Sequence, residues 1–236
     1  MIDEEQKQIE QKVAEAKRRI VQAAIAAGRR PEDILLVAAT KMNDADRVRA
    51  AIAAGVDICG ENRVQELLEK YEQHAYDGCP LHFIGTLQSN KVKYLIGKVS
   101  VIESVSSVKL ARVIDKEAAK AGIVQDILLE INIGREESKS GIDPDELCEA
   151  VDQIAACSHV RVRGLMAIPP KMQKSQEKTC YFDRMSQLFI DISAKKYDNI
   201  SMDYLSMGMS ADYEEAISCG ATIVRLGTAL FGARHY

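Results

Sequence analysis

The chain lacks several features by which common classes of protein are recognised. None of its apolar runs approaches the roughly 20 residues needed to span a bilayer, and its first residues, "MIDEEQKQIEQKVAEAKRRI", contain no signal-peptide hydrophobic segment. Positive charge is not in excess either, since 31 Lys and Arg against 35 Asp and Glu give a formal net charge of −4. We therefore expect a cytoplasmic protein that binds neither membranes nor nucleic acid.

Disulfide and metal signatures are also missing. The six cysteines are scattered without a C-x-x-C pair, and the four histidines form no ligand-like pair. In a cytosolic chain such cysteines are expected to be reduced and to pack as small hydrophobic side chains. A zinc site is not expected. There is no linker, low-complexity tract or shift in composition, so we expect residues 1–236 to form one domain.

Eight short apolar or β-branched runs recur along the whole chain, and helical patterns lie between them. Such near-continuous runs are typical of parallel strands that are covered on both faces. The alternation predicts a single (β/α)₈ TIM-type barrel. The alternative, an open doubly wound sheet, lacks its usual G-x-G-x-x-G motif at the first helix. The predicted strands are residues 34–40, 56–61, 81–86, 99–105, 126–133, 162–168, 204–210 and 222–228.

An additional helix is expected before the first strand, over residues 1–28. Its apolar stripe consists of Ile9, Val13, Ile20 and Ala27, and Gly28 ends it.

Local signals predict where two later helices begin. Asn43 is expected to cap the helix after Lys41, and Asp143 the helix that follows the fifth strand. The buried stripes after the fourth and fifth strands are predicted to be Ala111, Ile114, Ala118 and Ala121, and Leu147, Val151 and Ile154.

Barrel sites form at the C-terminal ends of the strands, and phosphate often binds after strands seven and eight. There the sequence places Ser210, and Gly227 with Thr228, each at the expected start of a helix. Helix N-termini offer unpaired N–H groups to an anion. The alternative is that Ser210 and Thr228 are ordinary N-caps.

Lys41 and Arg225 extend this picture. Strand eight of a closed barrel pairs with strand one, so Lys41 is expected beside the phosphate loops. It is then a solvated strand-end lysine, a phosphate counter-ion or a Schiff-base amine. Arg225 is expected to face the barrel interior, either paired with a carboxylate such as Glu61 or bound to a cofactor's ring nitrogen. A phosphate site, a reactive lysine and a ring-nitrogen partner together describe pyridoxal 5′-phosphate (PLP).

Five motifs between Ile34 and Arg234 resemble those of the pyridoxal phosphate homeostasis protein family. They are "GENRVQEL", "HFIGTLQSNKVKYL", "INIGREESKSGI", "GLMAI" and "LSMGMSADYEEAISCGATIVRLGTALFGAR". The resemblance implies a barrel similar to the N-terminal domain of alanine racemase, with PLP bound as an aldimine on Lys41. Thr86 stands where many members have histidine, which leaves any contact of that position undefined.

The resemblance also implies the remaining cofactor contacts. Ser210, Gly227 and Thr228 would hold the phosphate, and Arg225 would face the pyridine nitrogen. Asn62 would line the ring, and Met209 belongs to the same cofactor-binding set.

The expected role is a carrier that stores, shields or delivers PLP in intracellular vitamin B6 homeostasis, with PLP-dependent apo-enzymes as recipients. An arginine at the ring nitrogen gives up no proton readily, so the ring is a weak electron sink. The second domain of alanine racemase, which carries a tyrosine base, is not expected here. An amino-acid racemase or Schiff-base lyase is the alternative, and a phosphosugar enzyme without cofactor is a third. A closed barrel exposes no sheet edge, so a monomer is expected.

The loop "GREESKSG", residues 134–141, is expected to be either solvated surface or a gate with glycine hinges at Gly134 and Gly141. In the second case Lys139 would affect how fast the cofactor leaves.

Overall fold

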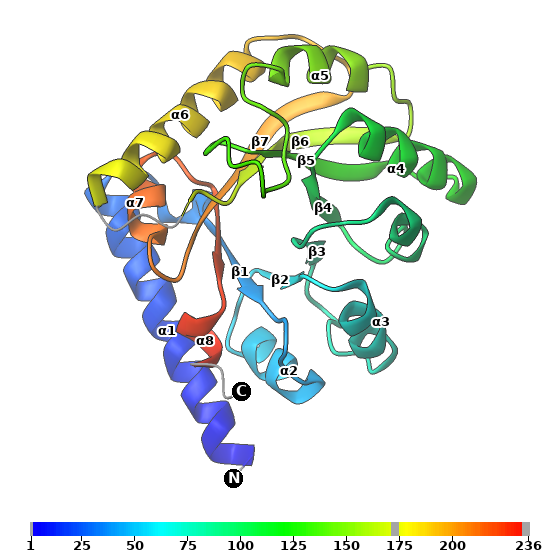
Figure 1. Ribbon diagram of the computed structural model, residues 1–236. Coiled ribbons are helices and arrows are strands. Elements are labelled where there is room, and N and C mark those ends of the chain that lie inside the picture. Colours follow the sequence, from blue (N-terminus) through cyan, green and yellow to red (C-terminus); the bar gives the residue numbers. More distant parts are fainter. Residues whose placement is uncertain (1, 171–174, 233–236) are drawn as a thin grey trace.

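The computed structural model describes residues 2–170 and 175–232, and the ends of the predicted domain and of the last motif lie outside them. Eight parallel strands form a closed barrel in chain order (Figure 1). β1 pairs with both β2 and β8, which excludes the open sheet and confirms the predicted barrel. The strands are β1 Leu35–Ala39, β2 Ile58–Glu61, β3 Leu81–Phe83, β4 Val101–Val105, β5 Gln125–Ile131, β6 Val160–Ala167, β7 Ile200–Met209 and β8 Ile223–Leu226.

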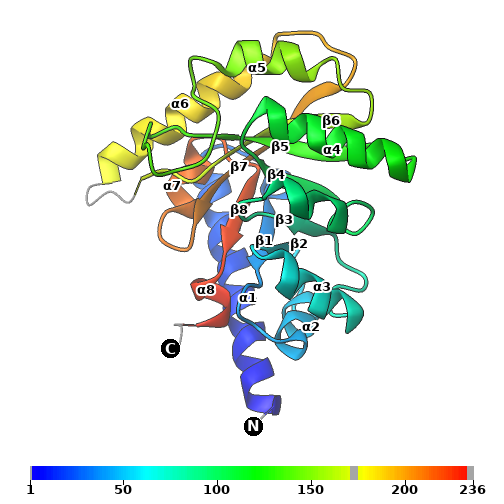
Figure 2. The ribbon, with the colours of Figure 1, turned by 45° about the vertical axis from the view of Figure 1, so that its right-hand side comes forward.

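Helices surround the barrel and connect its strands (Figures 1 and 2). The α-helices are α1 Ile2–Ala26, α2 Ala45–Ala53, α3 Val64–Glu72, α4 Val108–Ala121, α5 Leu147–Ile154, α6 Ser175–Ser193, α7 Tyr213–Ser218 and α8 Thr228–Phe231. Two 3₁₀ helices, η1 Pro31–Asp33 and η2 Ser89–Tyr94, complete the set. α1 lies along the side of the barrel against α2, α7 and α8, which confirms the expected additional helix.

The apolar stripe of α1 is buried as predicted at Ile9, Val13 and Ile20. The prediction of Ala27 was wrong: the helix ends at Ala26, and Ala24 continues the stripe because it follows Ile20 by four residues. Gly28 follows in the left-handed region, with φ of +67°, where a residue without Cβ is favoured.

The cap predicted for α2 was wrong by one residue. Asp44, in an extended conformation, accepts a hydrogen bond from the backbone N–H of Arg47 at 2.9 Å and is the N-cap. Asn43 instead donates through Nδ2 to the carbonyl of Lys41 at 3.0 Å. Its side chain therefore stabilises the turn before the helix.

Asp143 does not cap α5, because a turn intervenes and the helix begins at Leu147. Oδ1 of Asp143 accepts from the N–H of Asp145 at 2.8 Å, which closes a local turn. The stripes of α4 and α5 are buried as predicted, except that Ala121, at the end of α4, is exposed.

Side chains alternate between the inside of the barrel and the helices. Val37 packs with Ile58 and Ile223 in a small interior cluster, whereas Leu36 and Ala38 join the large cluster beneath the helices. This period of two places alternate residues on one face. Ala39 belongs to the same interior series as Val37 and ends β1, and Lys41 follows two residues later in the turn at the C-terminal end of the strand.

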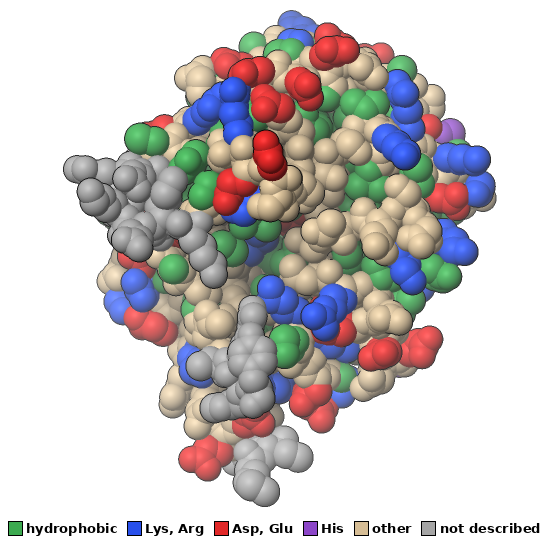
Figure 3. All heavy atoms as spheres, viewed as in Figure 1, with side chains coloured by type: hydrophobic (Ala, Val, Ile, Leu, Met, Phe, Trp, Pro, Cys, Tyr) green, Lys and Arg blue, Asp and Glu red, His purple; other side chains and the backbone are tan. Residues whose placement is uncertain are grey.

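The surface carries no dominant charge of one sign in the face that Figure 3 shows, where basic and acidic side chains are interspersed. Among the described residues, no helix is long and apolar enough to cross a membrane. The same part of the chain contains no group of three or more His, Cys, Asp or Glu side chains arranged to hold a metal ion.

Candidate functional site

Lys41 lies in the turn that directly follows β1, half-buried at the C-terminal end of the barrel. Ala38 of β1 is paired with Leu226 of β8, so the next residues, Ala39 and Gly227, are neighbours. A Cβ built on Gly227 would stand 3.6 Å from the Cβ of Ala39. The pairing thus brings the end of β1, two residues before Lys41, next to the turn after β8, and the predicted adjacency of Lys41 itself to that turn stays a prediction.

The turn after β8 and the loop after β7 meet through Ser210. Its Oγ accepts from the backbone N–H groups of Gly227 and Ala229, both at 3.3 Å. Thr228 is the exposed first residue of α8, as predicted. These bonds place the hydroxyl of Ser210 at the N-terminal end of α8, where an anion is favoured. We call Ser210, Gly227, Thr228 and Ala229 the anion cradle.

Ser210 does not begin a helix, contrary to the prediction. α7 starts at Tyr213, and Oδ1 of Asp212 accepts from the N–H of Met209 at 2.7 Å, so the chain turns before the helix. The hydroxyl of Ser210 is thereby directed to the start of α8. Met209 is partly exposed at the end of β7 and is paired with Arg225.

Arg225 faces the barrel interior as predicted and is almost completely buried. Nη1 donates to Ser206 Oγ at 2.5 Å, and Nη2 donates to the carbonyl of Ala167 at 2.8 Å. Ser206 donates in turn to Glu103 Oε2 at 2.6 Å, and His82 Nδ1 lies 2.7 Å from Glu103 Oε1. Burial lowers the pKa of Arg225, and the charge of Glu103 acts against that shift.

The expectation that Arg225 could pair with Glu61 was wrong, because Glu61 points to the other side of the sheet. Its Oε1 accepts from Thr40 Oγ1, Lys70 Nζ and Tyr76 OH at 2.6, 2.5 and 3.0 Å. Glu103, which the sequence analysis did not select, provides the interior carboxylate. The available signal was its place inside "VIESV", a polar residue in an otherwise buried strand.

A cavity of about 320 Å³ opens beside Lys41. Asn62 lines it together with Lys41, as predicted, and Thr86, Met42 and Arg63 complete its wall. The Oδ1 atom of Asn62 is buried without a hydrogen-bond partner among the described residues. Buried polar atoms are normally paired, so this oxygen favours a ligand at this position. Met42 and Arg63 were missed, although each directly follows a selected residue.

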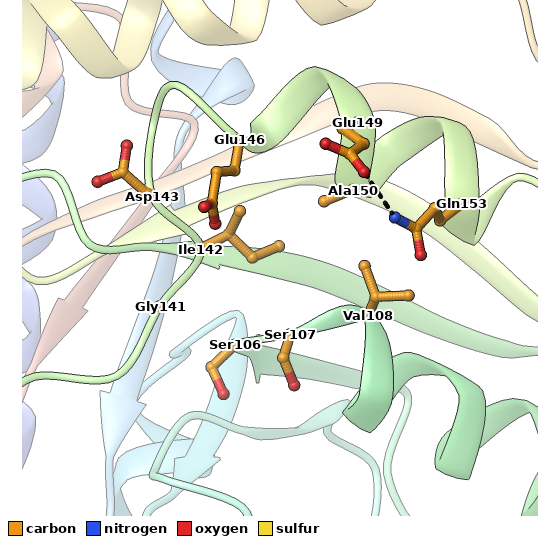
Figure 4. Close-up of a pocket in the computed structure, with 10 residues that line it drawn as sticks. All are labelled: Ser106, Ser107, Val108, Gly141, Ile142, Asp143, Glu146, Glu149, Ala150 and Gln153. Carbon is orange, nitrogen blue, oxygen red and sulfur yellow. Dashed lines mark hydrogen bonds between the residues drawn. The ribbon is translucent and has the colours of Figure 1, made fainter.

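A second cavity, of about 310 Å³, lies between the start of α4 and α5 (Figure 4). Ser106 and Ser107 line one side, and the carboxylates of Asp143, Glu146 and Glu149 line the other. These negative charges disfavour a phosphate group. An anionic ligand therefore fits the cradle better than this cavity.

The loop of residues 134–141 is fastened to the barrel mouth. Asn132 Nδ2 donates to the carbonyl of Glu136 at 2.9 Å, and Lys139 forms an ion pair with the carboxylate of Glu136. A Cβ at Gly134 would lie 2.3 Å from Pro170 Cγ, and one at Gly141 would lie 2.4 Å from the nitrogen of Asn132. Close packing therefore requires both glycines, and an effect of Lys139 on cofactor release stays a prediction.

Fold and site together define a closed α/β barrel with a lysine and an anion cradle at the C-terminal ends of its strands, where barrels of this type bind their ligands. The family model described as alanine racemase, N-terminal domain, matches residues 13–235. A pyridoxal phosphate homeostasis protein of Aquifex aeolicus is 44% identical over 218 residues, which cover 92% of this chain and 95% of that protein. The chain therefore belongs to the family of pyridoxal phosphate homeostasis proteins.

Solved structures agree with this assignment. A protein of unknown function from Bifidobacterium adolescentis superposes with a TM-score of 0.93 at 36% identity, covering 97% of this chain and 96% of that one. PipY of Synechococcus elongatus, solved with PLP bound, superposes with a TM-score of 0.78 at 32% identity, covering 90% of this chain and all of that one. An alanine racemase from Clostridium difficile, at 17% identity, shares the fold.

Proposed function

We propose that this chain binds PLP as a Schiff base on Lys41 and serves vitamin B6 homeostasis by storing, shielding or delivering the cofactor. The observation that carries the proposal is the pairing of β1 with β8, which brings the end of the strand that precedes Lys41 next to the turn that contributes to the anion cradle. The PLP bound to PipY, a relative of the same family, supports it. PLP supplies an aldehyde that reacts with a primary amine, and Lys41 is the amine that the fold presents there.

The remaining site residues receive roles that match their surroundings. The hydroxyls of Ser210 and Thr228 and the N–H of Gly227 would hold the phosphate. Arg225 would donate to the ring nitrogen, and Asn62 and Met209 would line the ring. The cradle at the N-terminal end of α8 and the unpaired Oδ1 of Asn62 fit such a ligand.

A carrier is favoured over the alternative of an amino-acid racemase or a Schiff-base lyase. The chain covers nearly the full length of relatives that are named homeostasis proteins. Ser206 and the carbonyl of Ala167 hold the guanidinium of Arg225, and Glu103 nearby favours its charged form. An arginine in this state donates a hydrogen bond but transfers no proton to the ring, which limits carbanion chemistry.

The proposal includes three further points. The chain acts as one domain over residues 1–236 and as a monomer, because the closed barrel leaves no sheet edge to pair with another chain. It works in the cytoplasm, which suits six described cysteines that form no disulfide. Its recipients are PLP-dependent apo-enzymes.

The test is to load the protein with PLP, reduce it with borohydride and locate the adduct by mass spectrometry. We expect a yellow protein with the adduct on Lys41, and a Lys41→Ala variant that loses the colour and the adduct. An adduct on another lysine would overturn the assignment. Incubation with L- and D-amino acids separates the two functions, since accumulation of racemised or cleaved product would favour the enzyme.

A further inference from the structure

The backbone on both sides of Lys41 is held by side chains, most of them from outside the turn. Lys70 Nζ of α3 donates to the carbonyl of Thr40 at 2.8 Å. Glu66 of α3 accepts from the N–H of Met42 through Oε2 at 2.8 Å. Asn43 completes the set with its bond to the carbonyl of Lys41. Peptide groups before and after Lys41 are therefore fixed.

Lys70 is itself held by a buried ion pair. Its Nζ lies 2.5 Å from Glu61 Oε1, and the side chains of Lys70 and Glu61 are 8% and 0% exposed. Thr40 Oγ1 and Tyr76 OH donate to the same carboxylate oxygen. A buried ion pair contributes little net stability compared with an apolar replacement, because both charges lose their hydration. Its geometric effect here is to direct one Lys70 hydrogen bond at the carbonyl of Thr40.

The turn itself adopts a conformation that needs such support. Met42 has φ of +61°, in the left-handed region that residues with a Cβ rarely occupy. The residue is 54% exposed, so burial does not explain the conformation. The hydrogen bond from its N–H to Glu66 does stabilise it. The direction in which Lys41 leaves the turn therefore depends on α3.

We infer that Glu66 and Lys70 of α3 are positioning residues that hold the turn of residues 40–43, so that Lys41 Nζ reaches the aldehyde of the bound cofactor. The inference rests on the proposed function. In that step Nζ attacks the aldehyde carbon, a C=N bond replaces the C=O bond, and the oxygen leaves as water with the two amine protons. Neither Glu66 nor Lys70 lines the cavity beside Lys41, so they act through the backbone of the turn.

The experiment compares two ligands. PLP reports covalent attachment through its absorbance, whereas pyridoxamine 5′-phosphate has no aldehyde and reports only contacts with phosphate and ring. For Glu66→Ala and the double variant Glu61→Gln with Lys70→Met, we expect attachment of PLP to slow on the order of tenfold or more. Glu66→Gln keeps an oxygen that can accept from the N–H of Met42 and should stay nearer to the wild-type rate. The affinity for pyridoxamine 5′-phosphate should stay within about twofold of wild type, because the anion cradle is untouched.

Controls keep the outcomes distinct. Glu69→Gln changes an exposed carboxylate on the same helix and should leave both measurements unchanged. Thermal unfolding checks that each variant folds. If the double variant of the buried pair does not fold, the Glu66 variants still test the inference, because Glu66 is partly exposed. A normal attachment rate in Glu66→Ala, or an equal loss of affinity for pyridoxamine 5′-phosphate, would overturn the inference alone. Absence of an adduct on Lys41 in the wild type would instead overturn the proposed function, and the inference with it.

Discussion

Glu103 and Glu130 are both buried inside the barrel, yet the protein shifts their pKa values in opposite directions. Burial raises the pKa of Glu103, but the hydrogen bond and charge of His82, with the charge of Arg225, outweigh it and lower the pKa below its ordinary value of 4.5. For Glu130 burial dominates over the hydrogen bond from Ser140, and the pKa rises. Two carboxyl groups near one arginine thus favour different protonation states.

These shifts predict opposite effects of pH on stability. A lowered folded-state pKa stabilises the protein above the unfolded value, and that contribution is lost as pH falls through the folded pKa, below 4.5. Glu103→Gln should therefore reduce the midpoint temperature at neutral pH and flatten the decrease of that temperature in acid.

Glu130→Gln is the matched control. Because a raised carboxyl pKa costs stability as pH rises above the ordinary value, this variant should be equally or more stable at pH 7. Thermal unfolding by circular dichroism from pH 3 to 7 measures both, and identical profiles for the two variants would contradict the assignment.

At the scale of elements, the anion cradle joins the end of β7 to the start of α8, although α8 has only four residues. Ser210 directly follows β7 and accepts from the N–H groups of Gly227 and Ala229 at the start of α8, so the end of β7 and the start of α8 help to place each other. The cradle therefore depends on the pairing of β7 with β8.

Ser210→Ala combined with Thr228→Ala should weaken PLP binding at least about tenfold, since charge-assisted hydrogen bonds contribute about 1.5–3 kcal/mol each. Titration with pyridoxamine 5′-phosphate, which binds without covalent attachment, measures the loss directly. Ser218→Ala, at an exposed serine of α7, serves as the control. Unchanged affinity in the double variant would leave both residues as simple helix-capping groups.

At the scale of the whole molecule, α1 packs against α2, α7 and α8, the helices connected to the first and the last two strands of the barrel. Arg29, just after α1, donates through Nη1 to the carbonyls of Ile217 and Ala221 at 2.8 and 2.7 Å. The N-terminal segment is thereby tied to the connection between α7 and β8. This supports the proposal of one cooperative domain.

Ile20→Ala tests that proposal. Ile20 belongs to the buried face of α1 and is 4% exposed, so its truncation should lower the free energy of unfolding by about 2–5 kcal/mol. Val21→Ala, at an exposed position of the same helix, should change it by no more than about 0.5 kcal/mol. Urea unfolding should show one transition by circular dichroism and by tyrosine fluorescence. Two separate transitions would show that α1 and the barrel unfold as independent units.

The sequence by itself determined the barrel and most of the candidate site. Eight apolar runs separated by helical patterns are typical of few other folds, and each strand delivers its chemistry where it ends. Lys41, Ser210, Gly227 and Thr228 could therefore be selected without knowing any contact. Their selection depended only on local alternation and on closure of strand eight against strand one.

Only the tertiary structure decided which residues those side chains meet. It replaced Glu61 by Glu103 and Ser206 as the neighbours of Arg225 and moved three predicted helix starts. It also brought Glu66 and Lys70 of α3 to the turn that holds Lys41. Alternation along a strand is a local property and states only which face a side chain occupies. The partner across the barrel depends on strand tilt and stagger, which exist only once all eight strands have closed.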